Sequence, residues 1–336
     1  LTWTFQNLVV RGIEAALAAA EGDDKAQRRL AGQIGVPGAL EVARELRNIL
    51  RGRDALATLG RQLPDHFNAL ADVKLLGVKA LLDARIGQKP DIFVHALVLV
   101  MSRLAAPWQM IRLATKAAES DNAVRIAATP YAIAVTIVLA EVERLVGELR
   151  ADLKSGRGVA VIALLKAIHD AARGLRTELD LSVDTAWGRQ LAAIRTDISS
   201  LLKSEIESMP GRARRLLRVR PANEVAFGSA LDTGDVAEAE ALIGFVDACR
   251  KYAGELALNE MTQRSYLDLQ QYLENSTPAL IEGLRQAGEG ERRFRQSQAD
   301  AAVRFCAKVF GPEYASQLAK AAEVAANSER KAAVKA

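Results

Sequence analysis

The chain has 336 residues and a net charge of +4, well short of the charge density typical of proteins that coat nucleic acid. Half of its residues are hydrophobic but only 5% are aromatic, and alanine, leucine and arginine dominate. Because these residues favour helices over strands, the composition predicts an all-α protein, long enough for one large domain or two ordinary ones.

A first amphipathic helix is predicted up to about Gly22, because apolar residues recur there every four positions. These residues are Phe5, Val9, Ile13 and Leu17. The glycines of residues 32–38 predict a turn, since no strand precedes them and the lysine and hydroxyl of a phosphate loop are missing. Further helices are expected over residues 39–51 and from Pro64 to about residue 86.

Residues 90–147 are the most apolar part of the chain. Both "DIFVHALVLV" and "YAIAVTIVLA" are hydrophobic nearly all round a helix, which predicts central helices flanked on several sides. Pro107 and Pro130 predict helix starts or kinks, because a proline inside a helix costs about 3 kcal/mol. The longest charge-free apolar window, residues 126–140, is shorter than the roughly 20 residues needed to cross a bilayer, so we predict no transmembrane helix.

The second half of the chain continues the helical pattern, with helices predicted over residues 158–179 and 182–207. An apolar stripe with alternating spacings of four and three predicts another helix from near Gly234. This stripe comprises Leu242, Val246, Cys249, Ala253 and Leu256. A helix should follow over residues 260–273, and Pro278 should begin either a new helix or a kinked continuation of it. Another helix should end at residue 310, and the last should begin at Pro312.

No run of alternating β-branched residues is bounded by turn signals, so essentially no β-sheet is expected. The pattern predicts a multi-helix bundle with two helical subdomains, residues 1–208 and 222–328, joined by an Arg-rich connector at 209–221. The alternative is an elongated helical stack in which the connector is another turn. Residues 329–336 are expected to form a disordered basic tail.

The connector contains five arginines and no acidic residue between Pro210 and Pro221. They are the candidate binding residues of this sequence: Arg212, Arg214, Arg215, Arg218 and Arg220. We prefer the interpretation that they pair with residues 231–290, which carry eleven acidic and four basic side chains. The alternatives are bidentate contacts to phosphates of nucleic acid or anionic lipid, and docking to an acidic protein partner.

No catalytic, metal or cofactor site is predicted. None of the three histidines has a second histidine or cysteine at i+3 or i+4, the spacing that aligns two metal ligands on one helix face. His95 is expected to be a hydrogen-bonded core residue. The nucleophile motif G-x-S-x-G is absent, so the sequence favours a protein that is not an enzyme.

The leading functional hypothesis is a non-enzymatic scaffold or interaction protein that binds a protein partner. One alternative is a module for nucleic acid or anionic lipid that uses residues 212–220. Another is an enzyme or a carrier of a small apolar ligand, with its pocket among helices 90–147 near His95 and Trp108. Two cysteines on apolar stripes, Cys249 and Cys306, fit a reducing compartment, so we expect a cytoplasmic protein, and the alanine and arginine content suggests a bacterial source.

Overall fold

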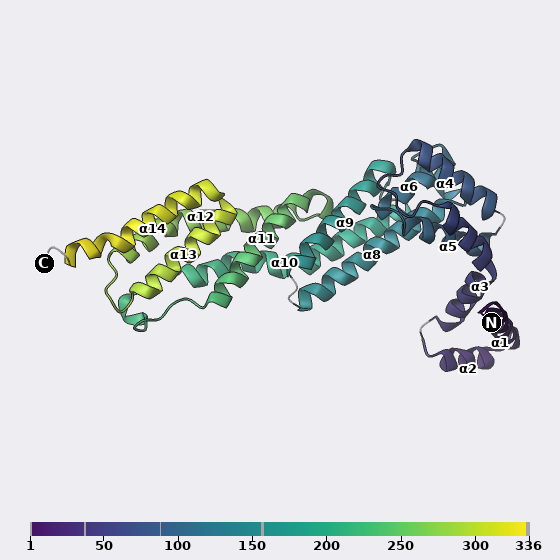
Figure 1. Cartoon of the computed structure of the whole chain (residues 1–336), viewed down its shortest axis with the longest axis horizontal. Helices are drawn as coiled ribbons and strands as arrows, with labels where there is room; N and C mark the ends of the chain where they lie inside the picture. Colours follow the sequence, from purple (N-terminus) through teal and green to yellow (C-terminus); the bar gives the residue numbers. More distant parts are fainter. Residues whose placement is uncertain (1, 37, 88, 156–157, 334–336) are drawn as a thin grey trace. The chain divides into compact units, whose positions relative to one another are not determined.

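The protein is all-α, as the composition predicts. The computed structural model describes residues 2–36, 38–87, 89–155 and 158–333 (Figure 1). This part of the chain is about 81% helical, with fourteen α-helices, two short 3₁₀ helices and no strand. Two isolated parallel bridges, Phe67 with Leu104 and Asn122 with Asp180, are its only β-type pairings.

The first seven α-helices and one 3₁₀ helix come from residues 2–127. Their bounds are α1 Thr2–Ala19, α2 Asp24–Ile34, α3 Ala39–Gln62, α4 Asp72–Arg85, α5 Pro90–Met101, η1 Pro107–Met110, α6 Ile111–Ala118 and α7 Ala123–Ala127. Pro107 begins η1 and Pro90 begins α5, which agrees with the preference of proline for the first position of a helix.

The remaining helices are longer. Their bounds are α8 Ala132–Ser155, α9 Gly158–Glu178, α10 Ala186–Leu217, η2 Ala222–Glu224, α11 Thr233–Leu256, α12 Asn259–Arg285, α13 Arg292–Val309 and α14 Pro312–Ala333. Pro278 lies within α12, so this proline does not begin a separate helix. α14 includes residues 329–333 of the expected tail, and residues 334–336 lie outside the described residues.

The chain forms two compact units, but they differ from the expected division at the Arg-rich segment. Unit 1 comprises residues 1–141 and 174–188, and unit 2 comprises residues 142–173 and 189–336. The boundaries therefore fall inside α8, α9 and α10 rather than between helices. No described helix is long and apolar enough to cross a membrane.

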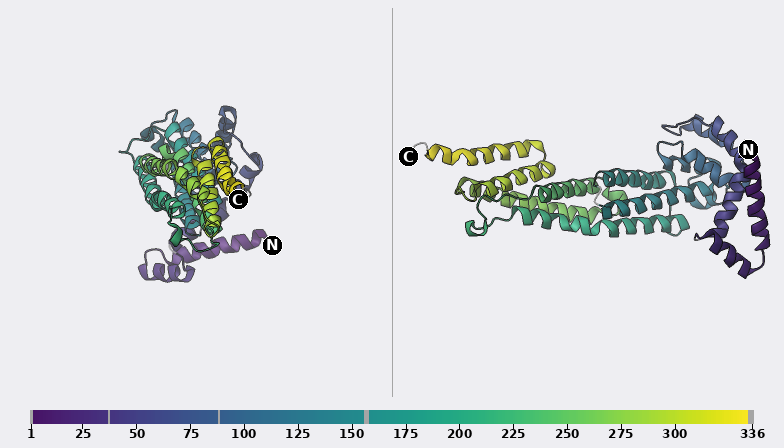
Figure 2. Two further views of the ribbon diagram at one scale, coloured as in Figure 1. Left: turned by 90° about the vertical axis from the view of Figure 1, so that its left-hand side faces the viewer. Right: turned by 60° about the horizontal axis from the view of Figure 1, so that its bottom comes forward.

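Unit 1 has its core in the apolar region that the sequence singled out. Leu97 and Val100 of α5, Ile111 of α6, Ile126 of α7 and Leu139 of α8 are fully buried there. In the same unit, α1 and α2 lie against α3 (Figures 1 and 2). These first helices contribute little to the core, since α2 buries no residue at all.

Residues 63–71 were expected to begin a helix at Pro64, but α4 begins only at Asp72. Phe67 donates its backbone N–H to the carbonyl of Arg103 at 2.8 Å and accepts from Ala105 at 2.9 Å. The backbone N–H of Leu70 donates to the side chain of Gln109 at 2.7 Å. Hydrogen bonds to residues about 40 positions away thus replace those of a helix, and a local pattern does not reveal them.

Unit 2 contains a bundle of the last four helices (Figure 2). α11, α12 and α13 pack against one another, and α14 packs on α12 and α13. All five residues of the predicted stripe on α11 are buried. Cys249 and Cys306 are buried with free thiols, as their positions on apolar stripes predict.

α10 passes through the proline that was expected to end it. It continues from Ala186 through Pro210 to Leu217 and so includes residues 209–217 of the proposed connector. An interior proline costs about 3 kcal/mol, whereas burying a large apolar side chain contributes about 1.5–3 kcal/mol. Met209, Leu216 and Leu217 are all buried around this proline. Their packing therefore outweighs the missing hydrogen bond.

Candidate functional site

Two of the five candidate arginines have carboxylate partners within unit 2. Arg212 on α10 forms an ion pair with Glu238 on α11, and Arg214 pairs with Asp268 on α12. Both carboxylates belong to the acidic 231–290 segment. The guanidinium of Arg214 also lies 5.4 Å from the centre of the Tyr272 ring. These two side chains are therefore less available to an external phosphate than the sequence alone suggests.

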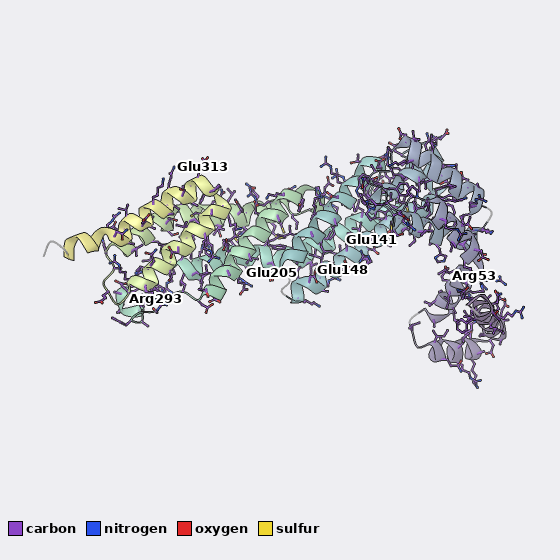
Figure 3. The ribbon with its side chains drawn as sticks, in the orientation of Figure 1. Arg53, Glu141, Glu148, Glu205, Arg293 and Glu313 are labelled. Carbon is purple, nitrogen blue, oxygen red and sulfur yellow. The ribbon has the colours of Figure 1, made fainter. Side chains whose placement is uncertain are left out.

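The other three arginines differ in their surroundings. Arg220 lies over the ring of Phe294, 5.3 Å from its centre. The side chains of Arg215 and Arg218 are exposed and form no hydrogen bond or ion pair with any described residue. Arg293, labelled in Figure 3, is also exposed at the start of α13. Arg215 and Arg218 are thus the two members of the predicted set whose side chains have no hydrogen-bond, ion-pair or ring partner among the described residues.

The backbone of this segment is anchored by two buried polar residues of α13. Gln298 donates from Nε2 to the carbonyls of Leu216 and Arg218, at 3.1 and 2.9 Å. Arg295 donates to the carbonyl of Arg220 and pairs with Glu291. The last carbonyls of a helix have no hydrogen-bond partner within the helix, and here side chains of α13 supply the donors. The segment is therefore fixed to the bundle by its main chain.

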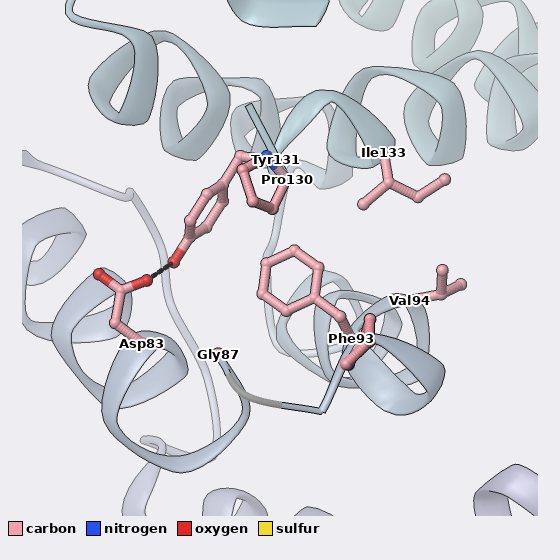
Figure 4. A pocket seen from close by; sticks show the side chains of 8 residues that line it. Asp83, Gly87, Phe93, Val94, Pro130, Tyr131 and Ile133 are labelled. Atoms are coloured by element: carbon pink, nitrogen blue, oxygen red, sulfur yellow. Dashed lines mark hydrogen bonds between the residues drawn. The ribbon is translucent and has the colours of Figure 1, made fainter. Parts of the chain in front are cut away.

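Unit 1 contains a largely apolar cavity of about 450 Å³ (Figure 4). Its walls come from three elements far apart in the sequence: the end of α4, the start of α5 and the turn leading into α8. The lining residues are Asp83, Gly87, Pro90, Phe93, Val94, Pro130, Tyr131 and Ile133. His95 and Trp108, near which a pocket was expected, are not among them.

One end of the cavity carries a linked group of polar side chains. The hydroxyl of Tyr131 donates to Oδ1 of Asp83 at 2.7 Å (Figure 4). Nζ of Lys79 donates to Oδ2 of the same carboxylate at 2.7 Å. The lysine ammonium lies 5.4 Å from the centre of the Tyr131 ring. Phe93 meets the same ring edge-on, with centroids 5.1 Å apart. Lys79 and Phe93 thereby contact the Tyr131 ring, and Asp83 binds its hydroxyl.

The protonation states of this group follow from burial and hydrogen bonding. Burial raises the pKa of Tyr131, and its hydrogen bond to the Asp83 carboxylate raises it further. Partial burial acts to raise the pKa of Asp83, but the hydrogen bonds from Lys79 and Tyr131 outweigh it, so this pKa lies below its usual value. At neutral pH the phenol is neutral and the carboxylate is charged. Neither is tuned for proton transfer near pH 7.

The histidines do not come together. Nε2 of His95 lies 2.7 Å from the carboxylate of Glu45, and the side chain is part-exposed rather than a core residue. His169 contacts its neighbour Asp170 at 3.1 Å, and its ring packs 5.0 Å from that of Tyr252. Among the described residues, no group of three His, Cys, Asp or Glu side chains is placed to hold a metal ion.

The first three helices carry an unusual number of exposed apolar side chains. Of the nineteen large hydrophobic residues that are exposed in the described chain, seven lie within residues 5–49. Three of them form a stripe on α3, which we name the α3 apolar face: Val42, Leu46 and Ile49. The spacing of i, i+4 and i+7 puts these three side chains on one side of the helix. Sequence reasoning did not single out this face.

Polar contacts link α1 to α3. Glu14 on α1 forms an ion pair with Arg51 on α3 at 2.5 Å. Arg53, labelled in Figure 3, donates to the side chain of Asn7 at 3.4 Å. With α1 held in this way, Phe5 is 66% exposed and Leu8 is 62% exposed. The N-terminal helices therefore present apolar surface that no described residue covers.

Comparison with known proteins gives no relative: no family model, no curated protein and no solved structure matches this chain.

Proposed function

We propose that this protein is a non-enzymatic interaction protein that binds a helical protein partner through the α3 apolar face. The observation that carries the proposal is the exposure of Val42, Leu46 and Ile49 in one stripe, with Phe5 and Leu8 exposed on the adjacent α1. Apolar side chains gathered on a surface are typical of protein interaction sites, because covering them removes apolar area from water.

A helix is the partner element that fits this stripe best. Apolar residues at i, i+4 and i+7 match the spacing with which one amphipathic helix packs on another. Charged residues border the stripe: Glu41 and Arg44 form an ion pair at 3.6 Å, and Glu45 is bonded to His95. Such a charged border around an apolar centre is the usual composition of an interface.

The Arg-rich segment supports this function less strongly. Arg212 and Arg214 already have carboxylate partners, and the ring of Phe294 covers one side of Arg220. A binding site for nucleic acid or anionic lipid would rest mainly on Arg215 and Arg218. We therefore place partner binding on α3.

We further propose that the protein acts in the cytoplasm. Cys249 and Cys306 are both buried and unpaired, and free thiols are typical of proteins that stay in a reducing compartment. Cell fractionation tests this directly. Recovery of the protein from an oxidising compartment would contradict it.

The binding proposal is tested by site-specific crosslinking in the cells that produce the protein. A photo-crosslinking amino acid in place of Leu46 should give one defined adduct with a polypeptide, either another protein or a second copy of this chain. The control places the same amino acid at Leu267 on α12, which is also exposed, and should give no such adduct.

A second variant distinguishes binding at the α3 apolar face from nonspecific crosslinking. Ile49→Asp puts a charge into the α3 apolar face and should abolish the adduct formed at position 46, because burying an unpaired carboxylate opposes binding. Circular dichroism confirms that the variant keeps its helices. The absence of an adduct at position 46, or an adduct that Ile49→Asp does not change, would refute the proposal.

A further inference from the structure

The cavity beside Tyr131 has the size and the wall chemistry of a small-molecule site. Its volume of about 450 Å³ lies within the range of roughly 300–1,000 Å³ that is common for ligand pockets. Phe93, Val94, Pro130 and Ile133 supply apolar walls (Figure 4). Such sites usually combine a mainly apolar lining with a few polar groups that fix the orientation of the ligand.

Of the polar groups at this cavity, the carboxylate of Asp83 is the one that accepts hydrogen bonds from its neighbours. Asp83 and Tyr131 line it, whereas Lys79 does not. A carboxylate offers about four acceptor positions, and Tyr131 and Lys79 occupy two of those on Asp83. The side chain of Asp83 is still 48% exposed. It therefore has acceptor capacity left for a ligand.

The shape and charge of the walls restrict the ligand further. The rings of Phe93 and Tyr131 stand edge to face at the cavity, so an aromatic or aliphatic body has apolar surface to pack on. Lys79 pairs with Oδ2 of Asp83 at 2.7 Å but does not line the cavity, so a negatively charged ligand inside it would still meet the carboxylate of Asp83 first. A cationic group would instead gain a charge-assisted hydrogen bond from it.

From these observations we propose that the cavity binds a small apolar molecule with a primary ammonium group, which donates to the carboxylate of Asp83. The hydrocarbon part of the ligand packs against Phe93, Val94 and Ile133. This site belongs to unit 1 and does not involve the α3 apolar face, so it adds a second binding activity to the proposed interaction with a protein.

The proposal is tested with 2-phenylethylamine as a probe, titrated into the full chain by isothermal calorimetry. Phenylacetate and 2-phenylethanol have the same ring and nearly the same size, but they carry an anionic and a neutral group. We expect the amine to bind at least about tenfold more tightly than either, because a hydrogen bond between two charged groups is the stronger kind. Equal binding of the three compounds, or no binding of the amine at millimolar concentration, would overturn the proposal.

Two variants locate the binding site. Asp83→Asn keeps an acceptor for Tyr131 but removes the charge, and should weaken amine binding about tenfold. Asp65→Asn is the matched control, since Asp65 forms an ion pair with Arg103 at 2.6 Å and does not line the cavity. Amine binding that is equally strong in Asp83→Asn and in Asp65→Asn would also contradict the proposal.

A third variant remains informative if Asp83→Asn does not fold. Val94→Phe adds bulk at a partly exposed position of the wall and should reduce binding of the amine by filling the cavity. Unchanged affinity in this variant would place the amine elsewhere on the protein.

Discussion

Gly174 on α9 lies against the indole ring of Trp108. A Cβ atom at position 174 would lie 2.3 Å from the indole ring, nearer than real side chains come. We predict that Gly174→Ala destabilises the protein by about 1–3 kcal/mol, the usual cost of overpacking a core. Urea unfolding followed by circular dichroism measures this change.

The matched control is Gly147 on α8, where an added Cβ would meet no atom within 4 Å. Gly147→Ala should stabilise the protein by up to about 1 kcal/mol, because alanine has the higher helix propensity. If both variants changed stability by the same amount, the contact between Trp108 and Gly174 would not be what constrains position 174.

The two thiols are protected by burial. Burial raises the pKa of Cys249 to about 12 and that of Cys306 to about 11. Because only the thiolate reacts, about one molecule in a thousand or fewer has a reactive cysteine at pH 8. We predict that the native protein is not labelled by iodoacetamide at that pH and that urea exposes two reactive thiols. Rapid labelling of the native protein would contradict this burial.

At the scale of the helix, Pro210 is a destabilising residue whose cost is offset by the packing of the buried residues around it. Pro210→Ala restores a backbone N–H inside α10 and should raise the free energy of unfolding by about 1–3 kcal/mol, allowing for lost contacts of the buried ring. Pro312→Ala is the control, since Pro312 is the first residue of α14 and a proline is favourable there. Urea denaturation of both variants should show a gain for Pro210→Ala alone.

The end of α10 depends on a side chain from another helix. Gln298→Leu removes the donor for the carbonyls of Leu216 and Arg218, and should cost about 1–3 kcal/mol because these acceptors lose their partner. Gln296→Leu changes a nearby residue whose bond, to Asp300, stays within α13. Thermal unfolding should show a larger loss for position 298. An equal loss at both positions would mean that the anchoring of α10 contributes little.

The sequence predicts well those structural features that depend on local periodicity. The stripe on α11 is found because its five apolar residues repeat at helical intervals within fifteen positions. The cavity is not found in this way, because Asp83 and Tyr131 are 48 positions apart and meet only after folding. The sequence gives only a weak indication that Gln298 and Arg295 are buried: each is a polar residue next to an apolar residue, Ala299 or Phe294, that is buried. Their partners are backbone carbonyls, which no sequence pattern marks.

At the scale of the whole molecule, the helix content is itself testable. With about 81% of the described residues in helices, the far-ultraviolet circular dichroism spectrum should show strong minima near the helical wavelengths and no strand component. A spectrum dominated by strand signal would contradict the fold.

The organisation into units was harder to predict than the fold class. The prolines at 210 and 221 suggested a break in the chain, since proline often ends a helix. The boundaries instead lie inside α8, α9 and α10, where no composition change marks them. Helix propensity acts over a few residues, whereas a unit is defined by which distant residues pack together.

The anchoring of α10 by α13 also has a consequence for how the chain is made. The three bonds that hold the end of α10 and the residues just after it join residues 75, 80 and 82 positions apart. During translation, the final turn of α10 leaves the ribosome well before Arg295 and Gln298 are synthesised. The carbonyls of Leu216, Arg218 and Arg220 are hydrated until then. The contact between α10 and α13 therefore forms late, because it requires closing a long loop whose entropy opposes folding.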